Sequence, residues 1–496
     1  MEINHRVPLL RHEDKDENEV LIAPNIFRAY DVRGIYPDDL NEDAAYKIAL
    51  SFARLYPKAK KIVVARDTRK SSPALAAKIK EALVESGKEV FDIGIAPDPL
   101  FYFSIFHYPS RRRRIYDGGI MVSGSHNPKE YNGLMMHIRK EKGKISEDVI
   151  GKDLEKIKKL AMGREELQDK MKRGRIHSLE ISKDYMDFVG KKIKLKRPLK
   201  IIIDSGNGAC GFLPENIFKK LGCKVKTIFG DFDGNFPNHL PDPYDEKNLA
   251  FLKKEVLERK ADLGFAFDSD GDRVGVIDNK GRVVSGDDCL LILAREVLQR
   301  KKGPIVHDVR VSKAFLDEME KLGAKTYFSI SHHSAVIRKI IEKKAVFGGE
   351  ITLHFLFPLD YYLCDEAIFA SLKIAEIASR QKDFAEYLDT LPRYHASPEV
   401  FIDSTDEEKF NIIKKLQKYL REKKYNFVSV DGARINFPHG WALARAANTT
   451  PIIKCRFEGD TKEDLIKIEN TALKIFKKVG IPVTKKTYQS LGLVEI

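Results

Sequence analysis

Short apolar runs that alternate with helical patterns dominate the first three quarters of the chain. The run at 61–65 has the pattern of a buried strand, and Ser72-Pro73 then begin a helix that extends to about residue 86. The same rhythm restarts near residue 199 and again near residue 287. Strands that alternate with helices of about 10–15 residues indicate parallel or mixed α/β sheets.

The pattern changes after roughly residue 392. A helix over 406–423, strands between 427 and 457, and a helix over 461–478 indicate a smaller α+β unit. A chain of 496 residues is also too long for a single hydrophobic core. We therefore predict three mixed α/β sheet domains and a C-terminal α+β domain, over 21–170, 171–285, 286–392 and 393–496, after a charged tail over 1–20.

The composition favours a cytoplasmic protein without a membrane partner. Hydrophobic residues make up 43% of the chain and charged residues 32%, which is ordinary for a globular protein. No apolar run approaches the length of about 18 residues that crosses a bilayer, and the first twenty residues are too charged for a signal peptide. The five cysteines lack C-x-x-C spacing, so neither a disulfide framework nor a zinc site is expected.

The formal net charge of +14 has two interpretations. It is either a basic solvated surface or an attraction for anions, such as a nucleic acid or a phosphorylated metabolite. Arg111 to Arg114 form the densest basic run, and no interleaved aromatic residues or nucleic-acid-binding motif accompany it. We interpret this run as a loop insertion and expect no nucleic-acid partner.

Ser125 follows an apolar strand pattern that ends at Val122. Because ligands bind beyond the carboxyl ends of strands in open α/β sheets, its hydroxyl is placed for group transfer, once activated or phosphorylated. His126 is adjacent, but neighbouring side chains on an extended loop diverge, so a Ser–His dyad is not expected. An ordinary polar turn is the alternative, because Asn127-Pro128 and Asn132-Gly133 are turn signals.

Three aspartates alternate in the segment DSDGDR, which follows a predicted strand. Asp268, Asp270 and Asp272 share one face of an extended segment, so three hard oxygen ligands converge as Mg²⁺ requires. An EF-hand is excluded, because Arg273 and Asn279 occupy its glycine and glutamate positions. The alternative, a solvated acidic turn, would leave three neighbouring carboxylates without a counter-ion.

Two further segments have groups that bind phosphorylated sugars. One segment offers a guanidinium, hydroxyls and backbone N–H groups to a dianionic phosphate. These groups belong to Arg445, Asn448, Thr449 and Thr450. The other segment places three polar side chains after a strand, where they could bond to sugar hydroxyls. These are Glu350, Thr352 and His354. Neither segment alone is enough to identify a binding site for a phosphorylated sugar.

Together, these segments resemble the α-D-phosphohexomutase family, most closely its phosphomannomutase/phosphoglucomutase branch. The match extends from about Phe27 to Glu458, nearly the whole chain. It includes FRAYDVRG (27–34), ARDTRKSS (65–72), SGSHNPKEYNG (123–133), FDSDGDRVGV (267–276) and DGARINFPHGWALARAANTTP (431–451).

The resemblance implies four domains around a central cleft and a role for each segment. Ser125 corresponds to the phosphoserine and is a metal ligand with the three aspartates, while Arg273 belongs to the metal loop. The other candidates are His126, as the neighbour of Ser125; Tyr30 and Arg33, which line the active site; Glu350, Thr352 and His354, near sugar hydroxyls; and Arg445, Asn448, Thr449 and Thr450, around the non-reacting phosphate.

The implied enzyme is a Mg²⁺-dependent isomerase that acts by intramolecular phosphotransfer. It would interconvert hexose 1-phosphate and hexose 6-phosphate, of mannose or glucose, through the phosphoserine and a bound hexose 1,6-bisphosphate. Its expected partner is a phosphorylated hexose, and its expected assembly a monomer or a small homo-oligomer.

Several positions depart from the family pattern. Met135 replaces a lysine that could transfer a proton, and Ile330-Ser331-His332-His333-Ser334 replaces KTGHS. Leu353 introduces a bulky side chain, Asp98 replaces a threonine, and Ala447 replaces a serine. Three alternatives follow: a mutase with a rearranged base, a mutase for another phosphosugar such as glucosamine phosphate, or a catalytically impaired phosphosugar-binding homologue.

Overall fold

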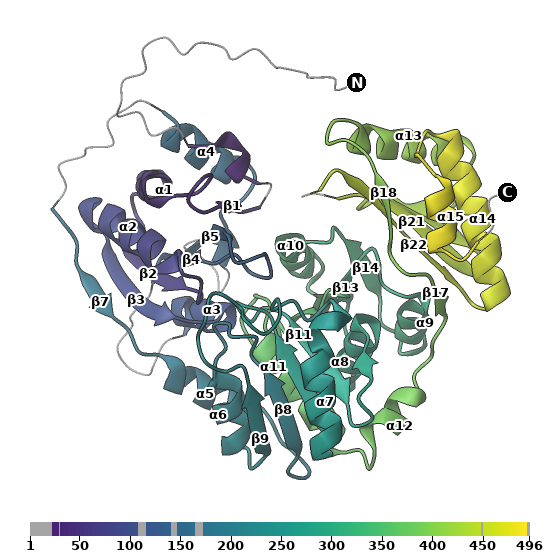
Figure 1. The fold of residues 1–496 in the computed structure, drawn as a ribbon, viewed down its shortest axis with the longest axis horizontal. Helices are drawn as coiled ribbons and strands as arrows, with labels where there is room; N and C mark the ends of the chain where they lie inside the picture. Colours follow the sequence, from purple (N-terminus) through teal and green to yellow (C-terminus); the bar gives the residue numbers. More distant parts are fainter. Residues whose placement is uncertain are drawn as a thin grey trace, which may run out of the picture.

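The computed structural model describes residues 22–28, 30–107, 116–139, 146–163, 172–447 and 450–493. Four β-sheets follow one another along an arc, from the purple first domain to the yellow fourth domain (Figure 1). The predicted class, three mixed α/β domains and a C-terminal α+β domain, is confirmed. Arg111 to Arg114, Asn448, Thr449 and the tail over 1–20 lie outside the described residues.

The first sheet places the Ser125 loop at the end of an inner strand. Its strand order is β1-β5-β4-β2-β3-β7, with β6 beside β5. The strands are β1 (Val32–Ile35), β2 (Lys61–Arg66), β3 (Glu89–Ile95), β4 (Gly118–Val122), β5 (Tyr131–Arg139), β6 (Ser146–Asp148) and β7 (Ile176–Ser178). β2 runs parallel to β3 and β4, whereas β5 runs antiparallel to β4 and β1.

Helices cover both faces of the first sheet, because side chains on alternate strand positions point to opposite faces. One face carries α1 (Glu42–Leu55), α2 (Ser72–Glu85) and α4 (Lys152–Ala161), in a core with Ile62 and Val64. The other face carries α3 (Asp98–Phe106), which packs with Val63 and Ala65. A 3-10 turn, η1 (Pro24–Ile26), precedes β1. The predicted strand at 61–65 and helix from Ser72 are confirmed.

The second sheet has the order β12-β11-β10-β8-β9. Its strands are β8 (Lys200–Asp204), β9 (Lys224–Ile228), β10 (Leu263–Phe267), β11 (Val274–Asp278) and β12 (Val283–Val284). α5 (Ser182–Gly190) and α6 (Leu213–Lys220) lie on one side, and η2 (Glu246–Leu249) and α7 (Ala250–Arg259) on the other. The acidic segment DSDGDR follows β10 directly.

The third sheet has the order β14-β13-β15-β16. Its elements are α8 (Gly286–Arg300), β13 (Ile305–Asp308), α9 (Lys313–Lys321), β14 (Thr326–Ser329), α10 (His333–Lys343), β15 (Phe347–Glu350), β16 (His354–Leu356), α11 (Ala367–Ser379) and α12 (Phe384–Asp389). Every residue of α11 is buried, because this helix contacts β10 and β11 of the second domain and β16 of the third.

The fourth domain is an antiparallel sheet of order β17-β22-β21-β20-β19, with β18 also beside β22. Its elements are β17 (His395–Ala396), β18 (Val400–Asp403), α13 (Glu408–Glu422), β19 (Phe427–Val428), β20 (Ala433–Phe437), β21 (Gly440–Ala446), β22 (Ile452–Gly459), α14 (Lys462–Lys478) and α15 (Lys485–Ser490). The two long helices match the predicted ranges.

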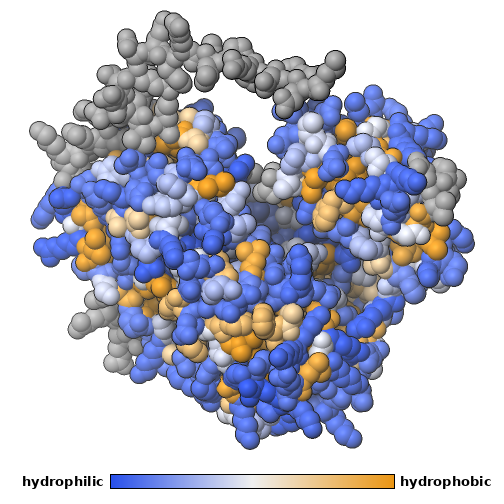
Figure 2. Space-filling view, in the orientation of Figure 1, coloured by the Kyte–Doolittle hydropathy of each residue, from blue (hydrophilic) through white to orange (hydrophobic). Residues whose placement is uncertain are grey.

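The first three domains share one hydrophobic core, whereas the fourth domain has its own. The surface is hollowed between the first and fourth domains (Figure 2), in agreement with the predicted central cleft. None of the helices in the described ranges is long and apolar enough to cross a membrane.

Candidate active site

The loop after β4 holds Ser125 in a fixed position. Ser125 has φ +47°, and its side chain and backbone are 5% exposed. Its backbone N–H donates to Ser123 Oγ at 2.9 Å, and Ser123 Oγ donates to Asp270 Oδ2 at 2.7 Å. The Gly124 N–H donates to Asp67 Oδ2 at 3.1 Å. These bonds connect the loop to β2 on one side and to the acidic segment of the second domain on the other.

Arg69, which the sequence analysis did not single out, is the central support of this loop. It is fully buried and pairs with Asp67 at 3.0 Å. Its guanidinium donates to four backbone carbonyls of the loop and the strand that follows, those of Ser125, Asn127, Pro128 and Tyr131. Gly124 is required beside it, because a Cβ there would lie 2.5 Å from Arg69 Nε.

The expected divergence of Ser125 and His126 is wrong. Ser125 Oγ lies 3.1 Å from His126 Nδ1, because the positive φ of Ser125 turns the backbone out of the extended conformation. Burial and the nearby guanidinium groups of Arg273 and Arg33 lower the pKa of His126 well below its ordinary value. The imidazole beside Ser125 is therefore neutral, with one ring nitrogen able to accept a proton.

Asp268, Asp270 and Asp272 place carboxylate oxygens within 4.8 Å of one another, and all three residues are buried. Ser125 Oγ lies 3.3 Å from Asp268 Oδ2. Asp270 Oδ1 and Asp272 Oδ1 have no hydrogen-bond partner among the described residues. Because an unpaired buried carboxylate is costly, this donor set of hard oxygens fits a divalent cation.

The pKa values of the three aspartates show how strongly their charges interact. Burial and the neighbouring carboxylates raise the pKa of Asp268 well above its usual range, and burial with Asp272 raises the pKa of Asp270 to about 6. Burial would also raise the pKa of Asp272, but His354 and Arg273 outweigh it and lower that pKa. A bound cation would stabilise all three ionised forms.

Arg33 and Tyr30 border the Ser125 loop. Arg33 Nη1 donates to Asn127 Oδ1 at 2.8 Å, so Arg33 contacts the loop directly. The Tyr30 ring stacks on His332, with 3.6 Å between ring centroids, and thereby joins the first domain to the third. Burial and Asp431 raise the pKa of Tyr30, so the fourth domain also affects this ring.

The predicted sugar-binding residues come together at the end of β15. Glu350 is the register partner of His354, and Glu350 Oε2 lies 3.2 Å from His354 Nδ1. Arg310 Nη2 donates to Thr352 Oγ1 at 3.3 Å. Leu353 has φ +74° and packs into the core shared by the first three domains. Its bulk is therefore buried in that core.

The predicted phosphate loop is described only in part. Arg445, at the end of β21, is buried, and its Nε lies 3.5 Å from Asp431 Oδ2. Thr450 is exposed, and its carbonyl accepts a hydrogen bond from Lys409 Nζ at 2.9 Å. Asn448 and Thr449 lie outside the described residues.

A chain of buried ion pairs beside the acidic segment was also missed. His137 Nδ1 lies 2.8 Å from Asp148 Oδ1, and His333 Nε2 lies 3.3 Å from Asp148 Oδ2. His333 Nδ1 in turn lies 3.2 Å from Asp365 Oδ2. These residues are far apart in sequence, and no local motif connects them. Two side chains near Met135 in sequence could replace the proton-transferring lysine of the family pattern, Lys129 and His137. Lys129 is exposed, whereas His137 is buried among these ion pairs.

Comparisons with known proteins agree with this geometry. Four family models match, described as phosphoglucomutase/phosphomannomutase alpha/beta/alpha domains I, II and III and C-terminal domain, over 24–162, 183–281, 285–394 and 402–474. A phosphomannomutase/phosphoglucomutase of Pseudomonas syringae is 35% identical over 464 residues, which cover 93% of this chain and 97% of the relative. A phosphoglucomutase/phosphomannomutase of Thermococcus kodakarensis is 31% identical, over a match that covers 88% of this chain and 95% of the relative.

A solved structure has the same arrangement. A phosphoglucomutase/phosphomannomutase family protein from Burkholderia thailandensis superposes with a TM-score of 0.86 at 32% sequence identity. The match covers 94% of this chain and 99% of the Burkholderia chain. The resemblance inferred from the motifs is thereby confirmed over nearly the whole chain. The chain belongs to the phosphoglucomutase/phosphomannomutase family.

Proposed function

We propose that the chain interconverts hexose 1-phosphate and hexose 6-phosphate, with mannose or glucose as the sugar, by means of a phosphoryl group on Ser125 and a bound hexose 1,6-bisphosphate. The observation that carries this proposal is the 3.3 Å distance between Ser125 Oγ and Asp268 Oδ2, across the boundary of two domains. It brings a hydroxyl nucleophile to a cluster of carboxylates that can hold a cation.

Asp268, Asp270 and Asp272, together with an oxygen of the group on Ser125, would hold Mg²⁺. Bound there, the ion would neutralise charge that develops on the transferred phosphoryl group. The chain itself fixes the position of Ser125. Arg69 and Ser269 both donate to the Ser125 carbonyl, and Ser123 bonds to its N–H. Such positioning supplies much of the rate enhancement in phosphoryl transfer.

In the first half-reaction, the bond between Ser125 Oγ and phosphorus breaks while a sugar hydroxyl oxygen bonds to phosphorus. The proton of that hydroxyl ends on Ser125 Oγ. His126 Nδ1, 3.1 Å from Oγ and neutral, is the ring nitrogen placed to hold or move this proton. The second half-reaction is the reverse, with the other phosphate of the bisphosphate transferred to Ser125.

The remaining site residues would bind the substrate. Glu350, Thr352 and His354 would bond to sugar hydroxyls, and Arg445 with Asn448, Thr449 and Thr450 would hold the non-reacting phosphate. Arg33 and Tyr30 would line the entrance between the first and third domains, and Arg273 would balance charge beside the metal loop. The enzyme would act in the cytoplasm.

A coupled assay with mannose 1-phosphate, glucose 1-phosphate and glucosamine 1-phosphate tests the proposal, with a hexose 1,6-bisphosphate activator and Mg²⁺ present. Turnover of the first two substrates is expected, and Ser125→Ala should abolish it. Preferential turnover of glucosamine 1-phosphate would move the assignment to an amino sugar. No turnover by protein shown to carry phosphoserine would contradict the mutase assignment and support a phosphosugar-binding role.

A further inference from the structure

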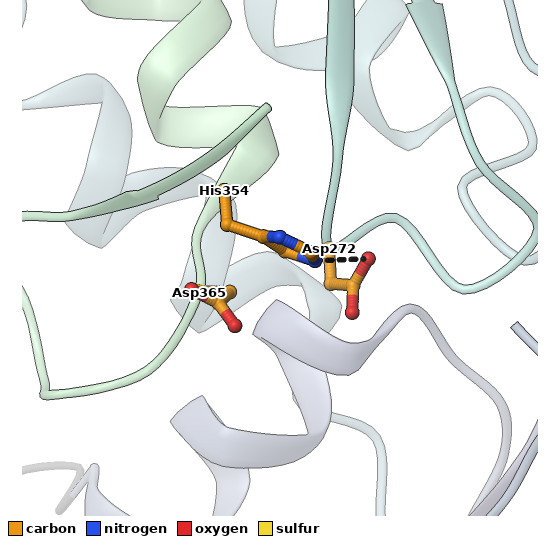
Figure 3. A group of neighbouring side chains, drawn as sticks. All are labelled: Asp272, His354 and Asp365. Atoms are coloured by element: carbon orange, nitrogen blue, oxygen red, sulfur yellow. Dashed lines mark ion pairs between the residues drawn. The ribbon is translucent and has the colours of Figure 1, made fainter. Parts of the chain in front are cut away.

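Asp272 belongs to a second group of potential metal ligands, besides the triad that it forms with Asp268 and Asp270. The group consists of Asp272, His354 and Asp365, whose ligand atoms all lie within 4.8 Å of one another (Figure 3). Asp272 comes from the loop after β10, His354 from the start of β16 and Asp365 from the segment before α11. All three side chains are buried.

Two carboxylate oxygens in this group accept no hydrogen bond from the described residues, although one of them, Asp272 Oδ1, lies in an ion pair with His354 Nε2 at 3.5 Å. Asp365 is 3% exposed, and its Oδ1 has no hydrogen-bond partner among the described residues; the same holds for Asp272 Oδ1. Asp98, also 3% exposed, has a carboxylate oxygen, Oδ1, that likewise accepts no hydrogen bond within the described part of the chain. Leaving such atoms unpaired in a protein interior costs free energy that a bound cation would remove.

Asp98 is held against the acidic segment by its own backbone. Its N–H donates to the Asp270 carbonyl at 2.6 Å, at the first turn of α3. Burial, together with the charges of Asp270, Asp272 and Asp365, raises the pKa of Asp98 well above its usual range.

The orientation of His354 suits a metal ligand. Glu350 Oε2 lies 3.2 Å from His354 Nδ1 without making a hydrogen bond, and the charge of this carboxylate would favour a proton on Nδ1, which leaves the Nε2 lone pair available to a metal. Nε2 faces Asp272 Oδ1 at 3.5 Å. Arg273 Nε donates to Nε2 at 3.1 Å and would have to turn toward Asp242, whose Oδ1 already lies 3.9 Å from Arg273 Nη1.

We propose that Asp272, His354 and Asp365 bind a second divalent cation. Asp272 would be shared between this ion and the cation of the aspartate triad. One imidazole with carboxylates favours Mn²⁺, Zn²⁺ or a similar transition metal over Mg²⁺. The site goes beyond the proposed function, because the phosphoryl transfer at Ser125 described above needs only the cation of the aspartate triad. With the second ion bound, His354 would be its ligand and would not bond to a sugar hydroxyl.

Such an ion would supply positive charge to a chain that lacks some basic residues of the family pattern. Met135 and Ile330 occupy positions at which the family pattern has lysines, while Asp98 adds a carboxylate in place of a threonine. A second cation would compensate for these three changes together. In the competing structure there is no second ion. His354 and Arg273 then balance Asp272, while His333 and His137 balance Asp365 and Asp148.

Metal binding to the full chain, without substrate, tests the proposal. The protein is stripped with chelator and titrated with Mn²⁺, and bound metal is counted by elemental analysis and followed by electron paramagnetic resonance. We expect two Mn²⁺ per chain and a spin-coupled signal, since two ions that share Asp272 would lie roughly 4 Å apart. Asp365→Asn should bind one Mn²⁺ with the six-line signal of an isolated ion, and His354→Gln should weaken the second ion at least tenfold.

Asp360→Asn is the matched control, because Asp360 is a nearby third-domain carboxylate that pairs with Arg300 instead. It should bind two ions. A single ion in the unmodified chain, or two ions with unchanged affinity in both Asp365→Asn and His354→Gln, would overturn the proposal. The signal of the unmodified chain decides the question even if a variant does not fold. Failure of mutase turnover would not affect this result, because no substrate is present.

Discussion

The Arg69 guanidinium donates a hydrogen bond to the backbone carbonyl of Ser125, 56 residues away in sequence. The same side chain supports three other carbonyls of the loop and strand that follow. Lysine has the same charge but cannot present a planar set of donors. Arg69→Lys should therefore slow phosphorylation of Ser125 by hexose 1,6-bisphosphate at least about tenfold, and lower the free energy of unfolding by about 3 kcal/mol.

Phosphoserine formation measured by mass spectrometry and urea unfolding test this prediction. Arg66→Lys is the control, since Arg66 lies on the same segment and makes one long bond, 3.4 Å, to the Asp67 carbonyl. Equal phosphorylation rates for Arg69→Lys and the unmodified protein would show that the loop keeps its position without the guanidinium.

Asp268 lies against Ser125 Oγ, so its removal should affect transfer more than folding. Asp268→Asn replaces a buried charge by a neutral amide and weakens the metal site. Because metal ions contribute several kcal/mol to such transition states, turnover should fall at least about 100-fold. Chelator should abolish turnover of the unmodified enzyme, and Mg²⁺ should restore it.

Asp262→Asn provides the comparison for Asp268, because Asp262 lies in the same domain but pairs with Arg197 near the surface. It should keep normal turnover. Full activity of Asp268→Asn in the coupled assay, or of the unmodified enzyme in chelator, would contradict the metal assignment.

His307, on β13, is buried and should make the protein acid-sensitive. Burial lowers its pKa to about 4 from an ordinary value of 6.5. The unfolded chain therefore takes up a proton below pH 6.5 that the folded chain accepts only near pH 4. Stability is fully present above pH 6.5 and falls as the pH decreases to about 4, by about 3 kcal/mol in total.

Urea unfolding midpoints at pH 7.5 and pH 4.5 measure this effect. His307→Gln should lose less stability than the unmodified chain between the two values. His439→Gln is the control, because His439 is exposed and its replacement should leave the difference unchanged. An equal loss in His307→Gln and the unmodified chain would show that His307 is not a source of acid sensitivity.

Local patterns predicted those parts of the fold that carry local signals. The helices α13 and α14 have one apolar face and were predicted to within two residues of their observed ends. The helices α3 and α11 are buried on all sides, so their sequences lack the amphipathic period, and neither was predicted.

The same distinction applies to the site. Ser125 and the three aspartates lie in compact motifs after strands, so the sequence identified both as candidates. Asp272 and Asp365 come from different domains and meet only in the folded chain. Arg69 lies in the matched segment ARDTRKSS, but that motif does not show which backbone carbonyls its side chain supports. The Ser125–His126 contact depends on a positive φ that the sequence does not specify.

Met135 is the departure most directly related to catalysis, and Met135→Lys tests its importance. Met135 is half-buried on β5 and packs against the core shared by the first three domains. A lysine there could extend its ammonium to the cleft while its stem stays buried. Turnover should rise several-fold, at a cost of about 1–2 kcal/mol in stability. Met135→Leu, which preserves the apolar volume, should change neither quantity, and equal turnover in all three proteins would show that this position does not limit the rate.

Leu353 combines a left-handed backbone, φ +74°, with a buried side chain, and two substitutions separate these effects. Leu353→Ala removes the buried side chain but keeps a Cβ in a conformation that disfavours it, so stability should fall by about 2–5 kcal/mol. Leu353→Gly removes the same packing and also relieves the backbone, so it should be more stable than the alanine variant by about 1 kcal/mol, the reverse of the order found in helices and strands. Because the Leu353 side chain packs in the core, the mannose-to-glucose preference of both variants should match that of the unmodified enzyme in the coupled assay. Urea unfolding gives the stability order, and an alanine variant more stable than the glycine variant would mean that the left-handed backbone at this position carries no strain.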